Sequence, residues 1–329
     1  MPSLWDSLLP ASLRPTVDTA QTTALIPLPA LGGIRLTGPE SMKFLQGQTT
    51  TDFRDIEKGK VLPGAICSLK GRVLFSFIAV PLGENVLLVL PADQIEAALA
   101  HLKKFAVFSK TRLESTSADT TLLGLAGPDT DRLLEQLGMQ PPAAAAMSKS
   151  EEGTLSVRLF NENRCLVVLP NAVLGHHWAS LQEKAEVVAE DAWWAADIHA
   201  GFTTVFAAGR DRFQPQELNY QALAAVSYNK GCYTGQEVVA RLYFRGKLKQ
   251  RLYRLEAATK AIGEDREIFS NGSRAGEVLM AAREPGERVA LLAVIKNAAV
   301  GEGKLTLGEN GPALHILGLP YGLPADKEE

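Results

Sequence analysis

The chain has 329 residues, of which 46% are hydrophobic and 22% are charged, and its formal net charge at pH 7 is −3. This length exceeds one typical domain, and this composition is that of a globular protein that buries a substantial core. The small negative charge gives no electrostatic reason for binding nucleic acid or an acidic membrane, so we expect no direct RNA contact and no membrane contact.

Two further features indicate a cytoplasmic protein. No apolar run approaches the ~20 residues that a membrane-spanning helix needs, and residues 1–6 lack the basic and apolar regions of a signal peptide. Cys67, Cys165 and Cys232 are widely spaced, which is typical of reduced thiols. Because the sequence has no CxxC motif and no Cys/His cluster, we expect no metal site built by the protein itself.

The first part of the chain predicts a flexible arm followed by an α+β unit. Residues 1–22 carry three prolines among small polar residues, which is typical of a loosely held segment. Residues 73–80 and 86–90 are apolar runs separated by Pro-Leu-Gly-Glu-Asn, which predicts a hairpin. In residues 93–105 apolar side chains recur at helical spacing, and a helix packed on antiparallel strands is an α+β arrangement.

The same grouping recurs further along the chain. Predicted strands at 122–126, 155–160 and 165–169 accompany predicted helices at 129–137 and 174–185. This recurrence indicates two related α+β layers, although the sequence shows no clean repeat.

From about residue 245 the pattern changes to short strands. The segments 248–255, 276–282, 289–294 and 314–317 are separated by Gly, Pro and Asn. This pattern favours a small barrel or sandwich as a separate C-terminal domain.

The most informative stretch is Asn-Lys-Gly-Cys-Tyr-Thr-Gly-Gln-Glu at residues 229–237, here called the signature loop. Thr234 and Glu237 have the spacing of a capping box, so we expect a short helix to begin there. Cys232 would then precede a helix N-terminus, with Lys230 two residues before it, and both positive groups favour a thiolate and a lowered thiol pKa. A small buried cysteine beside a helix cap is an equally good interpretation of these residues alone.

The segment Lys230-Gly-Cys-Tyr-x-Gly-Gln-Glu237 resembles the signature of the YgfZ family, folate-binding proteins related to the glycine-cleavage T-protein, an aminomethyltransferase. Further segments resemble blocks of the same family, in the same order, at residues 44–52, 70–72, 103–110, 213–219, 226–228, 239–241 and 244–246. The resemblance implies an α+β fold arranged as a three-domain ring around a central folate channel. Residues 23–244 would form two interleaved α+β domains, and residues 245–322 a C-terminal β-barrel.

The resemblance also implies a function and a site. We expect a tetrahydrofolate-binding protein that supports the assembly or repair of iron–sulfur enzymes, including tRNA-thiolating enzymes. Its partners would be iron–sulfur client proteins, which link it indirectly to tRNA modification. Cys232 is the expected catalytic thiol, and the residues expected to bind tetrahydrofolate or a derivative are Trp193, Asn219, Lys230, Tyr233, Gln236, Glu237 and Arg241.

Three positions bear on the expected folate site. A Trp pair such as Trp193 and Trp194 is more often core than a ligand platform, but the resemblance implicates Trp193 in folate binding and leaves Trp194 as core. His199 stands where these proteins commonly carry a glutamate that binds the pterin edge, and histidine cannot offer two carboxylate oxygens. Leu31 stands where some members carry a second folate-associated tryptophan.

Residues 241–254 contain six basic side chains and no acid. One interpretation is a positive lip for a folate glutamate tail or an RNA backbone. We favour a solvated strand face, because Lys247, Lys249 and Arg251 alternate with other residues at strand spacing. Arg241 and Arg245, which are nearer the signature loop, are better site candidates.

Two alternatives from other classes stay open. The first is a folate-dependent one-carbon (aminomethyl or methyl) transferase, which would depend on an acid such as Asp52. The second is a non-catalytic scaffold that uses Cys232 and the basic segment to dock a partner without folate.

Overall fold

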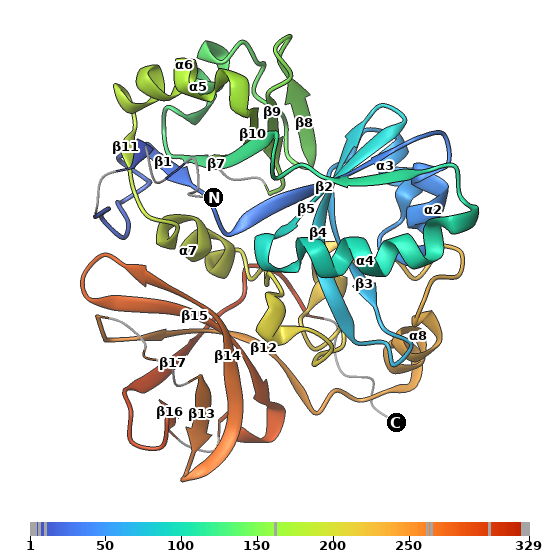
Figure 1. The fold of residues 1–329 in the computed structure, drawn as a ribbon. Helices are drawn as coiled ribbons and strands as arrows, with labels where there is room; N and C mark the ends of the chain where they lie inside the picture. Colours follow the sequence, from blue (N-terminus) through green and yellow to red (C-terminus); the bar gives the residue numbers. More distant parts are fainter. Residues whose placement is uncertain are drawn as a thin grey trace.

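The computed structural model describes residues 5, 8–9, 12–160, 163–260, 263, 266–301 and 304–323. Its first unit is a five-stranded antiparallel sheet in the order β3-β4-β5-β2-β6 (Figure 1). The strands are β2 (Leu31–Thr37), β3 (Leu62–Cys67), β4 (Val73–Leu82), β5 (Asn85–Pro91) and β6 (Arg112–Ser115). The helical segments of this unit are α2 (Ser41–Gln48), α3 (Phe53–Glu57), η1 (Ala92–Gln94), α4 (Ile95–Phe105) and η2 (Ala106–Phe108).

The second unit is a six-stranded sheet in the order β11-β1-β7-β10-β9-β8, in which only the β1–β11 pair is parallel among the described strands. Its strands are β1 (Ala24–Pro27), β7 (Thr120–Ala126), β8 (Ala146–Lys149), β9 (Leu155–Arg158), β10 (Arg164–Pro170) and β11 (Glu186–Val187). Its helices are α5 (Thr130–Gln136) and α6 (Asn171–Gln182). Because β1 precedes the whole first sheet in the chain, the two units are interleaved.

The two sheets pack face to face, and helices cover their outer faces. Strand β5 shows why its sequence is apolar at almost every position. Leu88 and Leu90 belong to the core that the first sheet shares with its helices, whereas Leu87 and Val89 belong to the core between the two sheets. A strand buried on both faces reads as a continuous apolar run.

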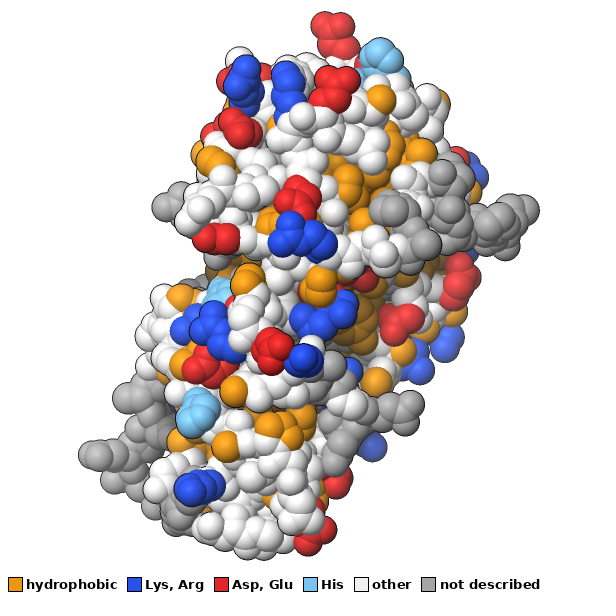
Figure 2. Space-filling view, turned by 90° about the vertical axis from the view of Figure 1, so that its left-hand side faces the viewer, with side chains coloured by type: hydrophobic (Ala, Val, Ile, Leu, Met, Phe, Trp, Pro, Cys, Tyr) orange, Lys and Arg blue, Asp and Glu red, His pale blue; other side chains and the backbone are white. Residues whose placement is uncertain are grey.

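The third unit is a closed barrel in the order β12-β15-β14-β13-β16-β17. Its strands are β12 (Gln250–Ala257), β13 (Glu267–Ser270), β14 (Ser273–Glu284), β15 (Arg288–Lys296), β16 (Leu305–Leu307) and β17 (Ala313–Leu317), with a short helical turn η5 (Asn297–Ala299). In β15, Leu291 and Ala293 fill the barrel, whereas Leu292 and Val294 pack outward against the segment that precedes the signature loop. On the molecular face shown in Figure 2, basic and acidic side chains are intermixed.

Helix α7 (Asp191–His199) lies where the three units meet (Figure 1). Ala192 and Trp193 belong to the core between the two sheets, whereas Ala195 and Ile198 belong to a core shared with the barrel strands. A helix that is apolar on opposite faces has to be covered on both. The chain between α7 and the barrel contains η3 (Ala207–Gly209), η4 (Tyr220–Leu223) and α8 (Gln236–Arg245).

The predicted fold class is confirmed: two α+β units are followed by a closed barrel. The predicted hairpin forms β4 and β5, and the predicted C-terminal strands overlap with β12, β14, β15 and β17. The short strands β1 and β11 were missed, since a strand of two to four residues gives too little pattern. Among the described residues, no helix combines the length and apolar character that crossing a bilayer requires.

Part of the N-terminal segment is packed against the second unit, which differs from the flexible arm expected from sequence. The Trp5 ring is buried and meets the Trp178 ring edge to face at a centroid distance of 5.2 Å. Arg14 forms an ion pair with Glu186 of β11. The segment contains several prolines, but the buried ring of Trp5 still anchors its beginning to the second unit.

Replacing Trp5 with alanine is expected to lower the free energy of unfolding by about 3 kcal/mol, because it removes a large buried ring. Phe108→Ala is the matched control, because it removes a ring that is 99% exposed; it should change stability by less than about 0.5 kcal/mol. Urea denaturation followed by circular dichroism measures both variants. Equal effects would show that Trp5 does not anchor the segment.

Candidate functional site

The signature loop leads into α8 through a glycine that no other residue can replace without strain. Gly235 is the N-cap of α8 and has φ = +83°. A Cβ atom there would lie 2.4 Å from the carbonyl oxygen of Ser68, in the turn between β3 and β4. The chain therefore needs a glycine here both for its left-handed backbone and for the close approach.

The predicted capping box is wrong. Helix α8 begins at Gln236, and its N-cap Gly235 has no side-chain hydrogen bond to the helix end. Thr234 lies in the turn before the helix, so its hydroxyl is not at the capping position. The N–H group of Gln236 donates instead to the backbone oxygen of Tyr233, at 3.1 Å.

The same turn contacts α8 a second time. A Cβ atom on Gly71, which has φ = +68°, would lie 2.9 Å from Cβ of Val238. Backbone packing at Gly71 and Gly235 thus fixes the start of α8 on the first sheet. Cys232, three residues before Gly235, is exposed, so the alternative of a buried structural cysteine is wrong.

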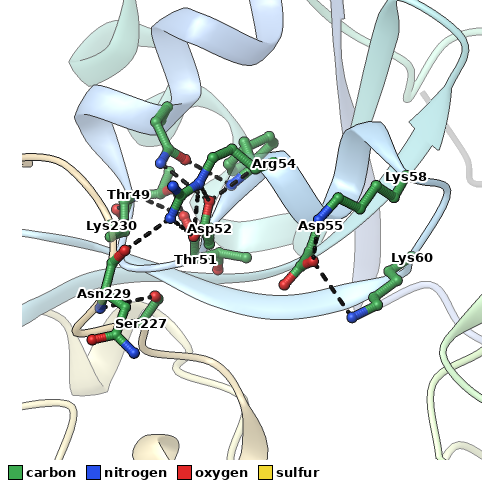
Figure 3. Close-up of polar contacts among 12 residues, drawn as sticks. Thr49, Thr51, Asp52, Arg54, Asp55, Lys58, Lys60, Ser227, Asn229 and Lys230 are labelled. Atoms are coloured by element: carbon green, nitrogen blue, oxygen red, sulfur yellow. Dashed lines mark hydrogen bonds and ion pairs between the residues drawn. The ribbon is translucent and has the colours of Figure 1, made fainter.

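Lys230 anchors the signature loop to the first unit. Its side chain is buried, and its Nζ donates to the backbone oxygens of Thr49 and Thr51, each at 2.6 Å (Figure 3). Burial lowers the pKa of this amino group to about 7, and the nearby Asp52 carboxylate opposes that shift. The sequence pattern predicted that this amine favours a Cys232 thiolate; the structure instead gives it an anchoring role.

Asp52 and Arg54 form a second link between the same two segments (Figure 3). The Asp52 carboxylate caps α3 by accepting from the Arg54 backbone N–H, and it also accepts from the Arg54 guanidinium. Arg54 Nη2 donates onward to the backbone oxygen of Asn229, at 2.8 Å. The hydrogen bond from Arg54 lowers the pKa of Asp52 to about 2, so this acid is ionised and engaged in structure.

A cavity of about 30 Å³ lies where the two sheets and α7 meet. Its walls include Trp193, Trp194 and the buried ion pair between Arg164 and Asp197, whose atoms are 2.7 Å apart. The Arg164 guanidinium also lies over the Trp193 ring, 4.8 Å from its centroid. Trp193 and Asp197 are four residues apart on α7, and that spacing puts both on the same side of the helix. We call this space the central cavity.

A second cavity of about 370 Å³ adjoins the central one, since Trp194 and Thr204 line both. Trp194 is half-buried and meets the Phe206 ring edge to face at 5.4 Å. It packs against the cores on both sides of α7, in line with the core role expected of it, and it also forms a wall between two cavities.

The two departures from the family pattern lie in different places. Leu31 lines the central cavity with Trp193. His199 is exposed, and its Nε2 lies 2.5 Å from Oε1 of Glu284 on β14, beside a hollow of about 600 Å³ that shares only Arg164 with the central cavity among the described residues. The carboxylate that lines the central cavity is Asp197, which sequence analysis did not identify as a site residue.

Comparison with known proteins agrees with this architecture. The family described as the GCVT N-terminal domain matches residues 10–159. A protein of Serratia proteamaculans named tRNA-modifying protein YgfZ is 33% identical over 321 residues, which cover 95% of this chain and 97% of that protein. Its Escherichia coli namesake is 32% identical over 317 residues and covers 94% of this chain and 97% of its own length.

The chain belongs to the YgfZ family. This confirms the resemblance found in the signature loop. A crystal structure of the glycine cleavage system aminomethyltransferase T from Bartonella henselae superposes with a TM-score of 0.76 at 20% identity, over 92% of this chain and 87% of that one. That similarity shows the shared fold.

The site residues expected from the YgfZ signature do not all lie in one place. Cys232, Tyr233, Gln236, Glu237 and Arg241 lie together on the loop and α8, and among the described residues none of these five lines the central cavity. Trp193 alone of the expected set lines it.

Asn219 has a structural position in this YgfZ member. It is fully buried, adopts φ = +58°, and donates from Nδ2 to the backbone oxygen of Leu252 on β12, at 3.0 Å. In the described part of the chain, no three His, Cys, Asp or Glu side chains are grouped so that they could hold a metal ion.

Gly235→Ala is expected to lower the free energy of unfolding by about 2 kcal/mol or more, because the new methyl group meets the Ser68 carbonyl in a strained backbone. Gly231→Ala in the same loop is the matched control, since nothing lies within 4 Å of a Cβ atom there. Thermal and urea denaturation compare the two. An unchanged Gly235→Ala protein would contradict the close packing described above.

Lys230→Met is expected to lower stability by about 1–3 kcal/mol, since it removes two hydrogen bonds to buried carbonyl groups. The wild type should also gain stability relative to this variant as pH rises above about 7. The pKa of Lys230 in the folded state is about 7, below its ordinary value of 10.5. Between these values the unfolded chain binds more protons, so stability increases with pH.

Denaturation of both proteins between about pH 7 and pH 9 measures this effect. The difference in unfolding free energy should widen by at most about 1.4 kcal/mol per pH unit. If the difference in unfolding free energy between the two proteins stays constant over this range, the pKa of the Lys230 amino group is not lowered.

Proposed function

We propose that this chain binds a reduced folate in the central cavity and supports the assembly or repair of iron–sulfur enzymes, including those that thiolate tRNA. Cys232 is the reactive thiol in this proposal. The observation that carries it is an aromatic-walled cavity with a buried carboxylate where the two sheets and α7 meet. The name of the relatives, tRNA-modifying protein YgfZ, and the GCVT family match support the same direction.

The residues of the central cavity suit the chemistry of a pterin ring. A pterin is flat and carries N–H donors on one edge, so it needs aromatic walls and a carboxylate acceptor. Trp193 and Trp194 supply the walls, Asp197 the acceptor, and Thr204 a hydroxyl group. A bound reduced folate would supply a one-carbon carrier at this place.

The volume of the central cavity sets a condition on binding. About 30 Å³ holds roughly two water molecules. The adjoining cavity of about 370 Å³ offers the missing space, and Trp194 stands between the two. Binding in this proposal therefore requires Trp194 to move, with Arg164 and Asp197 keeping Trp193 in place.

Cys232 is available for chemistry with a partner protein because it is exposed on a loop anchored at both ends. Lys230 and Arg54 hold the start of the loop, and Gly235 holds its end. An exposed thiol on such a loop can accept a one-carbon unit, exchange with a disulfide, or contact a cluster on a client protein.

The geometry of Asp52 favours this proposal over a one-carbon transferase that depends on that acid. A general base works best when its pKa lies near the working pH. The pKa of Asp52 is held at about 2 by Arg54, and its oxygens already accept hydrogen bonds that cap α3. The scaffold alternative differs from the proposal in one respect: a scaffold would dock its partner without binding folate.

Calorimetric titration of tetrahydrofolate into wild type, Trp193→Ala and Cys232→Ser tests the binding step. We expect saturable binding in wild type and Cys232→Ser, and a loss of at least about tenfold in Trp193→Ala, since one aromatic wall is gone. The same three variants are then expressed in cells that lack the gene, and thiolated tRNA nucleosides are measured by mass spectrometry. Both variants are expected to lower the thiolated fraction.

The two measurements test the folate assignment and the role of the thiol separately. Absence of wild-type folate binding would sink the folate assignment and leave the scaffold alternative. Full tRNA thiolation with Cys232→Ser would remove the thiol from the mechanism. Circular dichroism of Trp193→Ala confirms that any loss of binding is not a loss of fold.

A further inference from the structure

The outer side of α8 is positively charged and carries an exposed aromatic ring. Arg241, Phe244 and Arg245 are exposed, whereas Val239 faces the core. Residues three or four apart are neighbours on a helix surface, so Arg241 lies beside both Phe244 and Arg245. The Phe244 side chain is 53% exposed.

Basic residues on both sides of α8 extend this surface. Lys247 and Lys249 were predicted to lie on a strand face, but β12 begins only at Gln250, so that prediction is wrong and both are exposed in the connection after α8. Lys70 is exposed on the β3–β4 turn, which packs against α8 through Gly71. We call the whole set the α8 surface: Lys70, Arg241, Phe244, Arg245, Lys247 and Lys249.

The basic side chains of the α8 surface outnumber the acid beside them, which is Glu237, one turn before Arg241 on α8. Within the described part of the chain, none of its five basic side chains has an ion-pair partner, and Glu237 is the only acid in residues 229–249. Some bases elsewhere are paired with acids, as Arg212 is with Glu277 and Arg283 with Asp191. The face in Figure 2 likewise mixes both signs. A chain of net charge −3 therefore concentrates positive charge here, which bulk composition cannot reveal.

The aromatic side chains at this place form a fixed cluster. The Tyr243 ring stacks on Tyr228 at a centroid distance of 3.7 Å, and Phe244 meets Tyr243 edge to face at 5.0 Å. A held aromatic ring among bases that reach phosphates is the combination that binds single-stranded nucleic acid. Protein–protein interfaces are depleted in Lys, and three of the five bases here are Lys.

We propose that the α8 surface binds RNA directly, with its basic side chains on the phosphates and Phe244 stacked on an unpaired base. This replaces the expectation of no direct RNA contact, which rested on net charge alone. It goes beyond the proposed function, since it needs neither folate nor Cys232. Because the signature loop leads directly into α8, RNA bound to the α8 surface would lie next to that loop.

Fluorescence anisotropy with a labelled, unmodified tRNA transcript, without folate, tests the proposal. Arg245→Ala/Lys247→Ala is expected to weaken binding and to reduce the slope of log K against log salt by about 1.5 between about 50 and 200 mM. Phe244→Ala should weaken tRNA binding about tenfold but leave binding of a duplex RNA without unpaired bases unchanged. The matched control is Lys103→Ala/Lys104→Ala, in the last turn of α4, which removes the same charge elsewhere.

The control variant should bind tRNA like the wild type. No wild-type binding at the lowest salt, or an equal loss in the control, would overturn the proposal. Tighter binding of poly-glutamate than of tRNA at matched charge would also overturn it, and would indicate an acidic protein as the partner instead. Folate calorimetry on the Arg245→Ala/Lys247→Ala protein separates this result from the folate assignment, since neither residue lines the central cavity.

Discussion

The structure depends on the burial of α7. This helix carries Trp193 on the side of the two sheets and Ile198 on the side of the barrel, so it is stable only when all three units surround it. The central cavity lies on one side of α7, between this helix and the two sheets. Arg164 and Asp197 line this cavity as a charged pair, which is buried only because both partners are present.

A second set of contacts holds the signature loop, and with it Cys232, against the first sheet. The signature loop lies far from the first sheet in sequence, yet Lys230 and Arg54 tie its start to residues 49–54, and Gly235 ties its end to the β3–β4 turn. The loop is therefore held mainly by backbone groups and one buried amine. Such a loop can present Cys232 in a fixed place while leaving its sulfur open to large partners.

Sequence alone was sufficient for the fold class, the barrel and the family, because long apolar patterns and the signature loop are strong local signals. It failed where tertiary contacts decide. The Thr234–Glu237 spacing predicted a cap, but packing at Gly235 sets the start of α8. Asp197 had no distinguishing neighbour in sequence, and only its spacing from Trp193 could have shown that both face one cavity.

The interleaving of the two sheets has a consequence for how the chain folds. Strand β1 must wait for β7, about 100 residues later, and its first residue, Ala24, pairs with Glu186. The first sheet is complete within residues 31–115 and can form as soon as that segment has left the ribosome. The second sheet cannot, because β1 is separated from its partners β7 and β11 by the whole of the first sheet. Closing so long a loop is slow, so a collapsed species with one finished sheet and one exposed strand β1 should precede the native protein.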